Sequence, residues 1–229
     1  MKHLVLSAFL GFLWLAATPP HQGADSKTLV YADFEKTENN RPVSARGGLI
    51  QMYSYEESTV HKSTFKGLDG ADPPAPELVH LKKDDPNHAM KFDFSLRAPN
   101  QWAGVTVEIH GQPDADGKFV PDDVSGFKVL SLQVYATGIE ILRLEAISKG
   151  AGKDMGTVYP MMNFKVRQPG FNTYQVPLKG FTQPAWANVR VDPKDVFRAL
   201  TSINLTAFCD QCELNKQGMV VVDNIVFEK

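Results

Sequence analysis

The sequence predicts an all-β protein, a sandwich or barrel that carries one short helix. Many short segments alternate between apolar and polar residues with a period of two, which is typical of strands with one buried face. Residues that favour turns separate these segments at short intervals, as in β-sandwiches. The chain of 229 residues is long enough to form a single core.

The predicted strands follow one another along almost the whole chain. They cover 29–35, 49–55, 88–96, 103–110, 127–136, 139–148, 161–167, 172–178, 201–208 and 219–227. Two loops rich in proline, glycine and aspartate, 69–77 and 111–123, interrupt the series, because these residues favour turns.

Alternation within the strands separates a core face from a polar face. Val105 and Val107, for example, alternate with Thr106 and Glu108, and successive side chains of a strand point to opposite faces. The same rule assigns sixteen residues to the core: Met90, Phe92, Phe94, Leu96, Val105, Val107, Ile109, Leu130, Leu132, Val134, Leu142, Leu144, Ala146, Ile203, Leu205 and Ala207.

The one predicted helix begins after Asp192. Asp192 is a favourable N-cap, Pro193 suits the first helical position, and Asp195 lies three residues after the cap. We expect about two turns that close one end of the sandwich, with Trp186 packed beneath them.

The first residues predict export. An apolar segment from Leu4 to Ala17 follows Lys2, and small residues and prolines come next, which predicts a signal peptide over 1–17, a connector over 18–28 and one domain over 29–229. The alternative is an uncleaved anchor, but about 14 apolar residues fall short of the roughly 20 that span a bilayer. We therefore expect a secreted or periplasmic protein with no membrane span after cleavage. The net charge of −2 gives no basic footprint for nucleic acid.

Cys209 and Cys212 are the only cysteines. In an exported chain they predict a disulfide that closes a short loop. The alternatives are a redox motif, which needs the start of a helix, and a zinc site, which needs two more ligands.

Several segments together resemble a known family. "VYADFE", "WAGVTVEI", "SGFKVLSLQVYATG", "YQVPLKGFTQPAW" and "VVVDNIVFE" are similar, in their order and spacing, to galactose-binding-like β-sandwiches. Within this group the chain resembles family 11-like carbohydrate-binding modules and the complex I intermediate-associated protein domain. The resemblance implies a jelly-roll sandwich, non-catalytic binding of a polysaccharide or oligosaccharide, and a structural calcium ion that bridges the first and last strands.

The resemblance also implies the ligands of that calcium ion. If the first and last strands are neighbours, Asp223 lies close to Asp33 and Glu35, which share one face of the first strand. Calcium takes carboxylate oxygens in flexible geometry and would offset the repulsion of three acids. The alternative is that these acids face water or pair with lysines.

The predicted sugar-binding residues combine aromatic rings, which stack on sugars, with polar groups held by a rigid sheet. They are Gln133, Tyr135, Arg143 and Glu145, expected on neighbouring strands with the same outward parity, together with Trp102 and Tyr159. Asp93, Glu108 and Asn204 extend this set, and Tyr53, Tyr55 and Trp186 are further aromatic candidates. For Trp102, the alternative is a place in the core, and for Trp186 it is the packing beneath the helix. The alternative is an ordinary solvated face on which Arg143 pairs with an acid of a neighbouring strand.

The sequence contains no motif for a catalytic nucleophile or a phosphate-binding loop. We therefore predict a binding protein rather than an enzyme. The alternatives are a protein-interaction or assembly module of the complex I intermediate-associated type, with a protein partner, and a glycan-active hydrolase whose acids lie far apart in the sequence.

Overall fold

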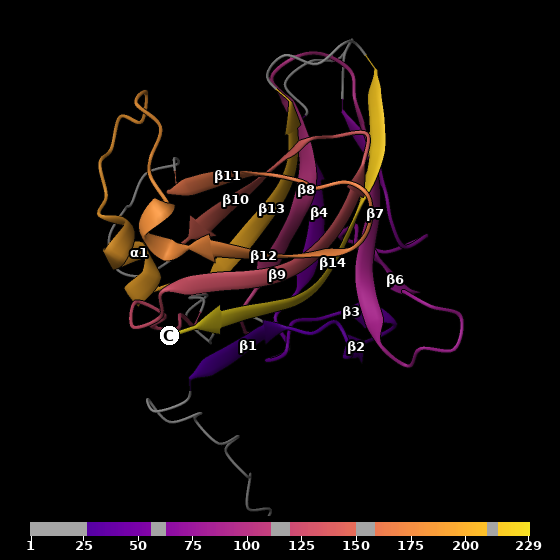
Figure 1. Ribbon diagram of the computed structural model, residues 1–229, viewed down its shortest axis with the longest axis horizontal. Coiled ribbons are helices and arrows are strands. Elements are labelled where there is room, and N and C mark those ends of the chain that lie inside the picture. The colour runs from indigo at the N-terminus through magenta and orange to yellow at the C-terminus, as the bar shows by residue number, and fades with distance from the viewer. Residues whose placement is uncertain (1–26, 56–62, 111–119, 150–158, 210–214) are drawn as a thin grey trace, which may run out of the picture.

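Two antiparallel sheets pack against each other in the computed structural model, which describes residues 27–55, 63–110, 120–149, 159–209 and 215–229 (Figure 1). A single cluster of buried apolar residues from both sheets fills the space between them. The predicted all-β sandwich with one short helix is confirmed.

The larger sheet has seven strands in the order β12-β9-β14-β7-β5, with β1 also paired to β14 and β6 to β7. Its strands are β1 (Thr28–Ala32), β5 (Thr64–Lys66), β6 (Glu77–His80), β7 (His88–Leu96), β9 (Val129–Thr137), β12 (Asn172–Pro177) and β14 (Lys216–Glu228). The apolar β14 lies between β7 and β9, where both of its edges are hydrogen-bonded. The pairing of β1 with β14 brings the first and last strands side by side, as expected.

The smaller sheet has five strands in the order β11-β10-β13-β8-β4. They are β4 (Ile50–Ser54), β8 (Gln101–Glu108), β10 (Ile141–Ile147), β11 (Met161–Lys165) and β13 (Ser202–Cys209). The remaining elements are a two-stranded ribbon of β2 (Thr37–Glu38) and β3 (Arg41–Pro42), the 3-10 turn η1 (Leu178–Gly180) and the helix α1 (Pro193–Arg198).

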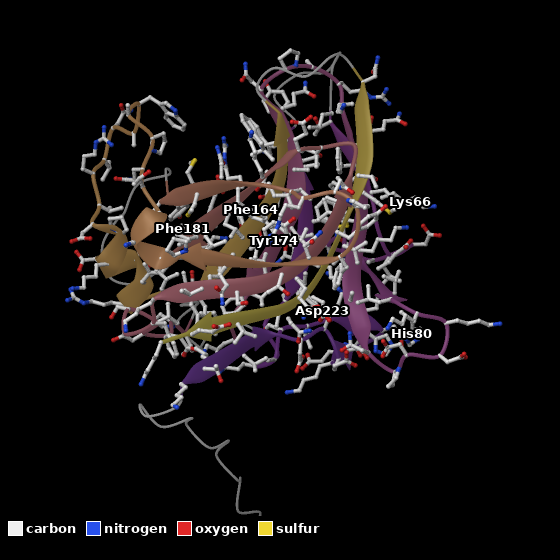
Figure 2. The ribbon with its side chains drawn as sticks, in the orientation of Figure 1. Lys66, His80, Phe164, Tyr174, Phe181 and Asp223 are labelled. Carbon is white, nitrogen blue, oxygen red and sulfur yellow. The ribbon has the colours of Figure 1, made fainter. Side chains whose placement is uncertain are left out.

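The core matches the alternation of the sequence. All sixteen residues assigned to the core face are buried. The sheets are also joined by specific contacts: the Tyr31 hydroxyl of β1 donates a hydrogen bond of 2.7 Å to the Val107 carbonyl of β8. At another edge the rings of Phe164 on β11 and Tyr174 on β12 lie 4.9 Å apart between their centroids (Figure 2).

The ten predicted strands are all present with ends shifted by a few residues, and the short strands β2, β3, β5 and β6 were not predicted. The first strand is the main correction, because it ends at Ala32 rather than at residue 35. Phe34 is buried, but its φ of 57° lies in the left-handed region, so Asp33 and Glu35 do not share a strand face.

The connection between β9 and β10 corrects a second expectation. These consecutive strands belong to different sheets and do not pair with each other. Gly138, which follows β9 with a φ of 72°, lies so close to β14 that an added Cβ would be 1.9 Å from the Gln217 carbonyl oxygen. The chain therefore crosses from one sheet to the other at a position that only glycine can occupy without displacing a backbone.

The helix α1 begins where the sequence predicts. The Asp192 side chain accepts a hydrogen bond from the Lys194 amide, Pro193 occupies the first turn, and Val196 and Phe197 are buried. Trp186 is a correction: it does not pack beneath the helix, since it is 68% exposed.

Three predictions concern residues beyond these elements. The signal peptide and connector lie almost entirely outside the described residues, and so does Cys212, the predicted partner of Cys209. No helix in the part of the chain that the structure describes is long and apolar enough to cross a membrane.

Candidate functional site: the outward face of the five-stranded sheet

The outward face of the five-stranded sheet carries three parallel rows of side chains that run across the strands. Directly paired residues of antiparallel strands point to the same face, so the strand register defines each row. The Glu145 row consists of Gln51, Thr106, Asn204, Glu145 and Met161. The Arg143 row consists of Tyr53, Gly104, Thr206, Arg143 and Asn163. The Trp102 row consists of Tyr55, Trp102 and Phe208, with Tyr55 joined to Trp102 through a backbone hydrogen bond.

Hydrogen bonds connect the centre of the Glu145 row. The Thr106 hydroxyl donates to Oδ1 of Asn204 at 2.8 Å, and Nδ2 of Asn204 donates to Oε2 of Glu145 at 3.1 Å. These three side chains come from β8, β13 and β10, so the bonds hold the Glu145 carboxylate at a fixed place on the sheet.

The Arg143 row is ordered in the same way. The Tyr53 hydroxyl lies 2.5 Å from the Thr206 hydroxyl, and the intervening residue is Gly104. Burial raises the pKa of Tyr53 far above its usual value, and the nearby charge of Glu145 raises this pKa further. At the other end of the row, Nε of Arg143 donates to Oδ1 of Asn163 at 3.1 Å.

Aromatic rings make up the Trp102 row. The rings of Tyr55 and Trp102 meet edge to face with 4.7 Å between centroids. The guanidinium carbon of Arg143 lies 3.8 Å from the centroid of the Phe208 ring, a cation–π contact that links this row to the Arg143 row.

The face therefore combines planar apolar rings with fixed hydrogen-bond donors and acceptors. Rings of this kind cover the apolar faces of a ligand, and an amide, a guanidinium and a carboxylate bind its hydroxyl groups. Glu108, a predicted extension of the site, also points to this side but is only 7% exposed. Its burial raises the pKa of its carboxyl, although Lys149 opposes the shift.

The structure divides the predicted sugar-binding residues between two surfaces. Arg143, Glu145 and Trp102 lie on the face described above, and Tyr159 comes just before β11. Gln133 and Tyr135 lie on β9, in the other sheet. The expectation that Gln133 and Tyr135 lie on a strand next to that of Arg143 and Glu145 is therefore wrong.

The strand order also assigns the further candidate residues to one sheet or the other. Asp93 lies on β7 of the larger sheet, whereas Asn204, Tyr53 and Tyr55 join the five-stranded face. Thr106, Thr206, Asn163 and Phe208 are not among the site residues predicted from the sequence. Alternation along each strand predicts that these side chains point away from the core. Only the pairing of β8, β11 and β13 with their neighbours shows that they lie beside Arg143, Glu145 and Trp102.

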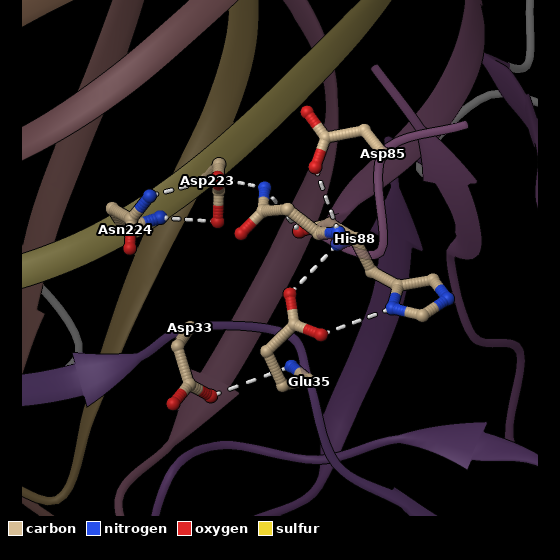
Figure 3. A network of polar contacts seen from close by, with 7 residues as sticks. Asp33, Glu35, Asp85, His88, Asp223 and Asn224 are labelled. Carbon is tan, nitrogen blue, oxygen red and sulfur yellow. Dashed lines mark hydrogen bonds and ion pairs between the residues drawn. The ribbon is translucent and has the colours of Figure 1, made fainter. Parts of the chain in front are cut away.

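A second polar group lies where β1 and β14 meet, around Asp223 (Figure 3). Asp223 is 1% exposed, at a bulge in β14. Its carboxylate accepts hydrogen bonds from Nδ2 of Asn87 at 2.8 Å and from the backbone and side chain of Asn224 at 2.7 and 2.8 Å. Burial raises the pKa of Asp223; these hydrogen bonds oppose the shift, whereas the charges of Glu35 and Asp33 add to it.

Asp33 and Glu35 belong to the same polar region. Glu35 accepts two hydrogen bonds from His88, from its amide at 2.7 Å and from Nδ1 at 3.0 Å, and its own amide donates to Asp33 at 3.4 Å (Figure 3). Burial alone would raise the pKa of Glu35, but His88 outweighs this effect and lowers it.

The three predicted calcium ligands thus influence one another electrostatically, with N–H groups bound to their oxygens. Among the residues that the structure describes, no three His, Cys, Asp or Glu side chains are grouped closely enough to hold a metal ion.

The sequence matches no protein-family model and no curated protein sequence. Solved structures do match. The family 11 carbohydrate-binding module of the cellulosomal cellulase Lic26A-Cel5E of Clostridium thermocellum matches with a TM-score of 0.52 and 18% identity over 88% of this chain and 94% of that chain. A family 11 module from the same organism, in complex with a β-1,3-1,4-mixed-linked tetrasaccharide, matches with a TM-score of 0.52 and 19% identity over 88% and 95%.

The chain has the β-sandwich fold of the family 11 carbohydrate-binding modules. The resemblance stated from the sequence is thereby confirmed for the fold, and at these identities the likeness extends no further. The alternative resemblance to the complex I intermediate-associated protein domain stays a prediction.

Proposed function

We propose that this protein is a non-catalytic carbohydrate-binding protein whose ligand lies on the outward face of the five-stranded sheet. The observation that supports this most directly is the composition of the three rows. A hydrogen-bonded strip from Thr106 through Asn204 to Glu145 lies beside Arg143 and beside the rings of Tyr55 and Trp102. Sugars present hydroxyl groups around their edges and C–H groups on their faces, so they need both kinds of contact.

The register of the rows indicates how a chain would lie. Five strands spaced about 4.8 Å apart make the sheet roughly 19 Å wide, which gives room for several consecutive sugar units along one row. A chain that crosses the strands would meet Thr106, Asn204 and Glu145 in turn. For a shallow site on this face we expect dissociation constants between micromolar and millimolar.

Affinity electrophoresis through gels that contain single polysaccharides, including β-1,3-1,4-mixed-linked glucan, tests the proposal. We expect the wild-type protein to be retarded by at least one polysaccharide, and Arg143→Ala or Glu145→Gln to lose most of this retardation while keeping the wild-type melting temperature. Gln133→Ala and Tyr135→Ala on the opposite sheet are the matched controls and should behave as the wild type.

Two results would overturn this assignment. Loss of binding in the β9 variants with binding intact in the β10 variants would move the ligand to the seven-stranded sheet. Capture of one partner protein without retardation by any polysaccharide would favour an assembly module instead.

A structural calcium ion at Asp33, Glu35 and Asp223 is a second part of the proposal. The side-chain oxygens of Asn87 and Asn224 lie in the same region and are of the type that calcium takes. The raised pKa of Asp223 predicts how the stability of the calcium-free protein changes with pH. In chelator, the folded protein holds the Asp223 proton more tightly than the unfolded chain, so stability falls as the pH rises through the raised pKa.

Excess calcium chloride should remove this loss of stability in the wild type, and it should not change the melting temperature of Asp223→Asn. Identical melting curves of the wild type in calcium and in chelator, over the whole pH range, would exclude the ion.

Export is the third part. We propose that the leader over 1–17 is removed, which sequencing of the N-terminus of the protein recovered from its host would test. A first residue at Met1 would contradict it.

A further inference from the structure

The segment between η1 and α1 exposes an unusual amount of apolar surface. Trp186 is 68% exposed and Val189 is 45% exposed, whereas most large apolar side chains of the described residues are buried. Tryptophan has one of the largest apolar surfaces of any side chain, and a contact that covers it is favourable. The sandwich itself does not use this ring.

The segment is nevertheless well ordered by its own hydrogen bonds. Gln183 holds both sides of it, since its Nε2 donates to the Val189 carbonyl at 3.0 Å and its Oε1 accepts from the Val191 amide at 2.8 Å. The guanidinium of Arg190 donates to the carbonyls of Pro184 and Ala185 at 3.1 and 2.7 Å. We call residues 183–191 the Trp186 loop.

This bracing has a consequence for binding. Arg190 and Gln183 fix the backbone on both sides of Trp186, so little backbone freedom remains to be lost when a ligand covers the ring. An exposed ring on a preorganised loop is suited to contact a ligand.

The Trp186 loop begins at the edge of the candidate sugar-binding face. Thr182 pairs with Met161 through two backbone hydrogen bonds of 2.9 and 3.0 Å. Met161 is the last member of the Glu145 row, so Thr182 continues that row by one position. The loop that follows stands beside α1, at the end of the sheet where β11 begins (Figure 1).

We propose that Trp186 is a stacking platform that extends the sugar-binding face beyond its edge strand and contacts the part of a long glycan chain that projects past β11. This inference rests on the proposed function of the sheet face. It assigns a separate role to the loop: Trp186 distinguishes a polymer from a short oligosaccharide that the sheet alone can hold.

The chemistry of the loop favours a neutral glycan over other ligands. Pro184, Ala185 and Ala187 surround Trp186 in the sequence, and Arg190 is the only charged residue of the loop. The loop itself therefore carries one positive charge, whereas attraction to an anionic membrane surface needs several basic residues close together. A flat ring with small, uncharged neighbours leaves space for a sugar to lie on it.

The test compares ligands of two lengths. Titration calorimetry with the full chain would use β-1,3-1,4-mixed-linked glucan and its tetrasaccharide, with the wild type, Trp186→Ala and Val189→Ala. Val189→Ala is the matched control, because it removes exposed apolar surface from the same loop without removing a ring. We expect Trp186→Ala to lower the affinity for the polymer by roughly 3- to 10-fold, the usual contribution of one aromatic stacking contact.

The other expected results define the role of the loop. The tetrasaccharide should bind Trp186→Ala as it binds the wild type, and Val189→Ala should match the wild type with both ligands. Arg190→Ala, which frees the loop, should lose part of the affinity for the polymer alone.

The outcomes separate this inference from the function on which it rests. If the wild type binds both ligands and Trp186→Ala binds the polymer with unchanged affinity, the platform is wrong and the sheet site stands. An equal loss for both lengths would place Trp186 inside the primary site and overturn the length-dependent role. Binding of neither ligand by the wild type would reject both proposals for this glucan. Binding to anionic vesicles that is lost in Trp186→Ala would make the loop a membrane contact.

Discussion

Replacement of Gly104 by alanine tests how closely β8 approaches its neighbours beneath the candidate site. A Cβ at this position would lie 2.3 Å from the Leu205 carbonyl oxygen, 2.9 Å from the Thr206 Cα and 3.1 Å from the Tyr53 hydroxyl. The first two contacts are with backbone of β13, which is hydrogen-bonded on both sides, so the strand has little freedom to move away. The third contact lies on the Tyr53–Thr206 hydrogen bond.

These contacts set the size of the effect. Overpacking a close contact costs about 1–3 kcal/mol, and loss of one hydrogen bond costs about 0.5–1.5 kcal/mol, so we expect Gly104→Ala to lower the free energy of unfolding by roughly 2–4 kcal/mol. With a urea dependence of about 2 kcal/mol per molar, the midpoint of unfolding should fall by roughly 1–2 M.

Equilibrium urea unfolding, followed by fluorescence, measures this shift. Gly126→Ala is the matched control, because no atom lies within 4 Å of the added Cβ and the backbone of Gly126 is not in the left-handed region. This control should keep the wild-type midpoint or raise it slightly, since alanine restricts the unfolded chain. Equal midpoints for Gly104→Ala and Gly126→Ala would refute the close approach of β8 to β13.

Variants at three further positions test other parts of the structure. Tyr31→Phe removes the hydrogen bond between the two sheets and leaves the Val107 carbonyl without that donor, so thermal or urea unfolding should show a loss of about 1–2 kcal/mol; an unchanged stability would contradict the contact. Asp192→Ala removes the N-cap of α1 and should cost about 1 kcal/mol, whereas Asp192→Ser should retain most of the stability and so separates capping from charge. Asp122 is placed against His110 and Arg46; burial alone would raise the pKa of this carboxyl, but the two basic partners outweigh burial and lower it. Because the pKa of Asp122 is lower in the folded protein than in the unfolded chain, its contribution to stability is present above about pH 4 and is lost as the pH falls through the folded pKa. The melting temperature of Asp122→Asn should therefore depend less on pH in that range than the melting temperature of the wild type. If the two pH profiles are parallel, the contacts of Asp122 with His110 and Arg46 contribute nothing.

The sequence predicted local features of this protein well. The side-chain period of two identified the buried residues of β7, β8, β9, β10 and β13, because parity along a strand depends only on local backbone geometry. The N-terminus of α1 was equally predictable, since Asp192 and Pro193 act on the backbone of the next few residues.

The candidate site was predictable only in part. Arg143 and Glu145 were identified by residue type and outward parity and Trp102 by residue type alone, but parity does not tell which sheet a strand joins. Gln133 and Tyr135 were grouped with them because β9 and β10 are consecutive in the sequence. The crossing at Gly138 separates these strands, and that crossing depends on the position of Gln217, far along the chain.

Residue type and spacing thus determined the strands, the core face and the helix cap. The tertiary structure alone decided which polar residues share a surface, that the strand before Asp33 and Glu35 stops at Ala32, and that Trp186 faces solvent. The physical reason is the range of the interactions: alternation and capping act over a few residues, whereas strand pairing and close backbone contacts join residues that are distant in the sequence.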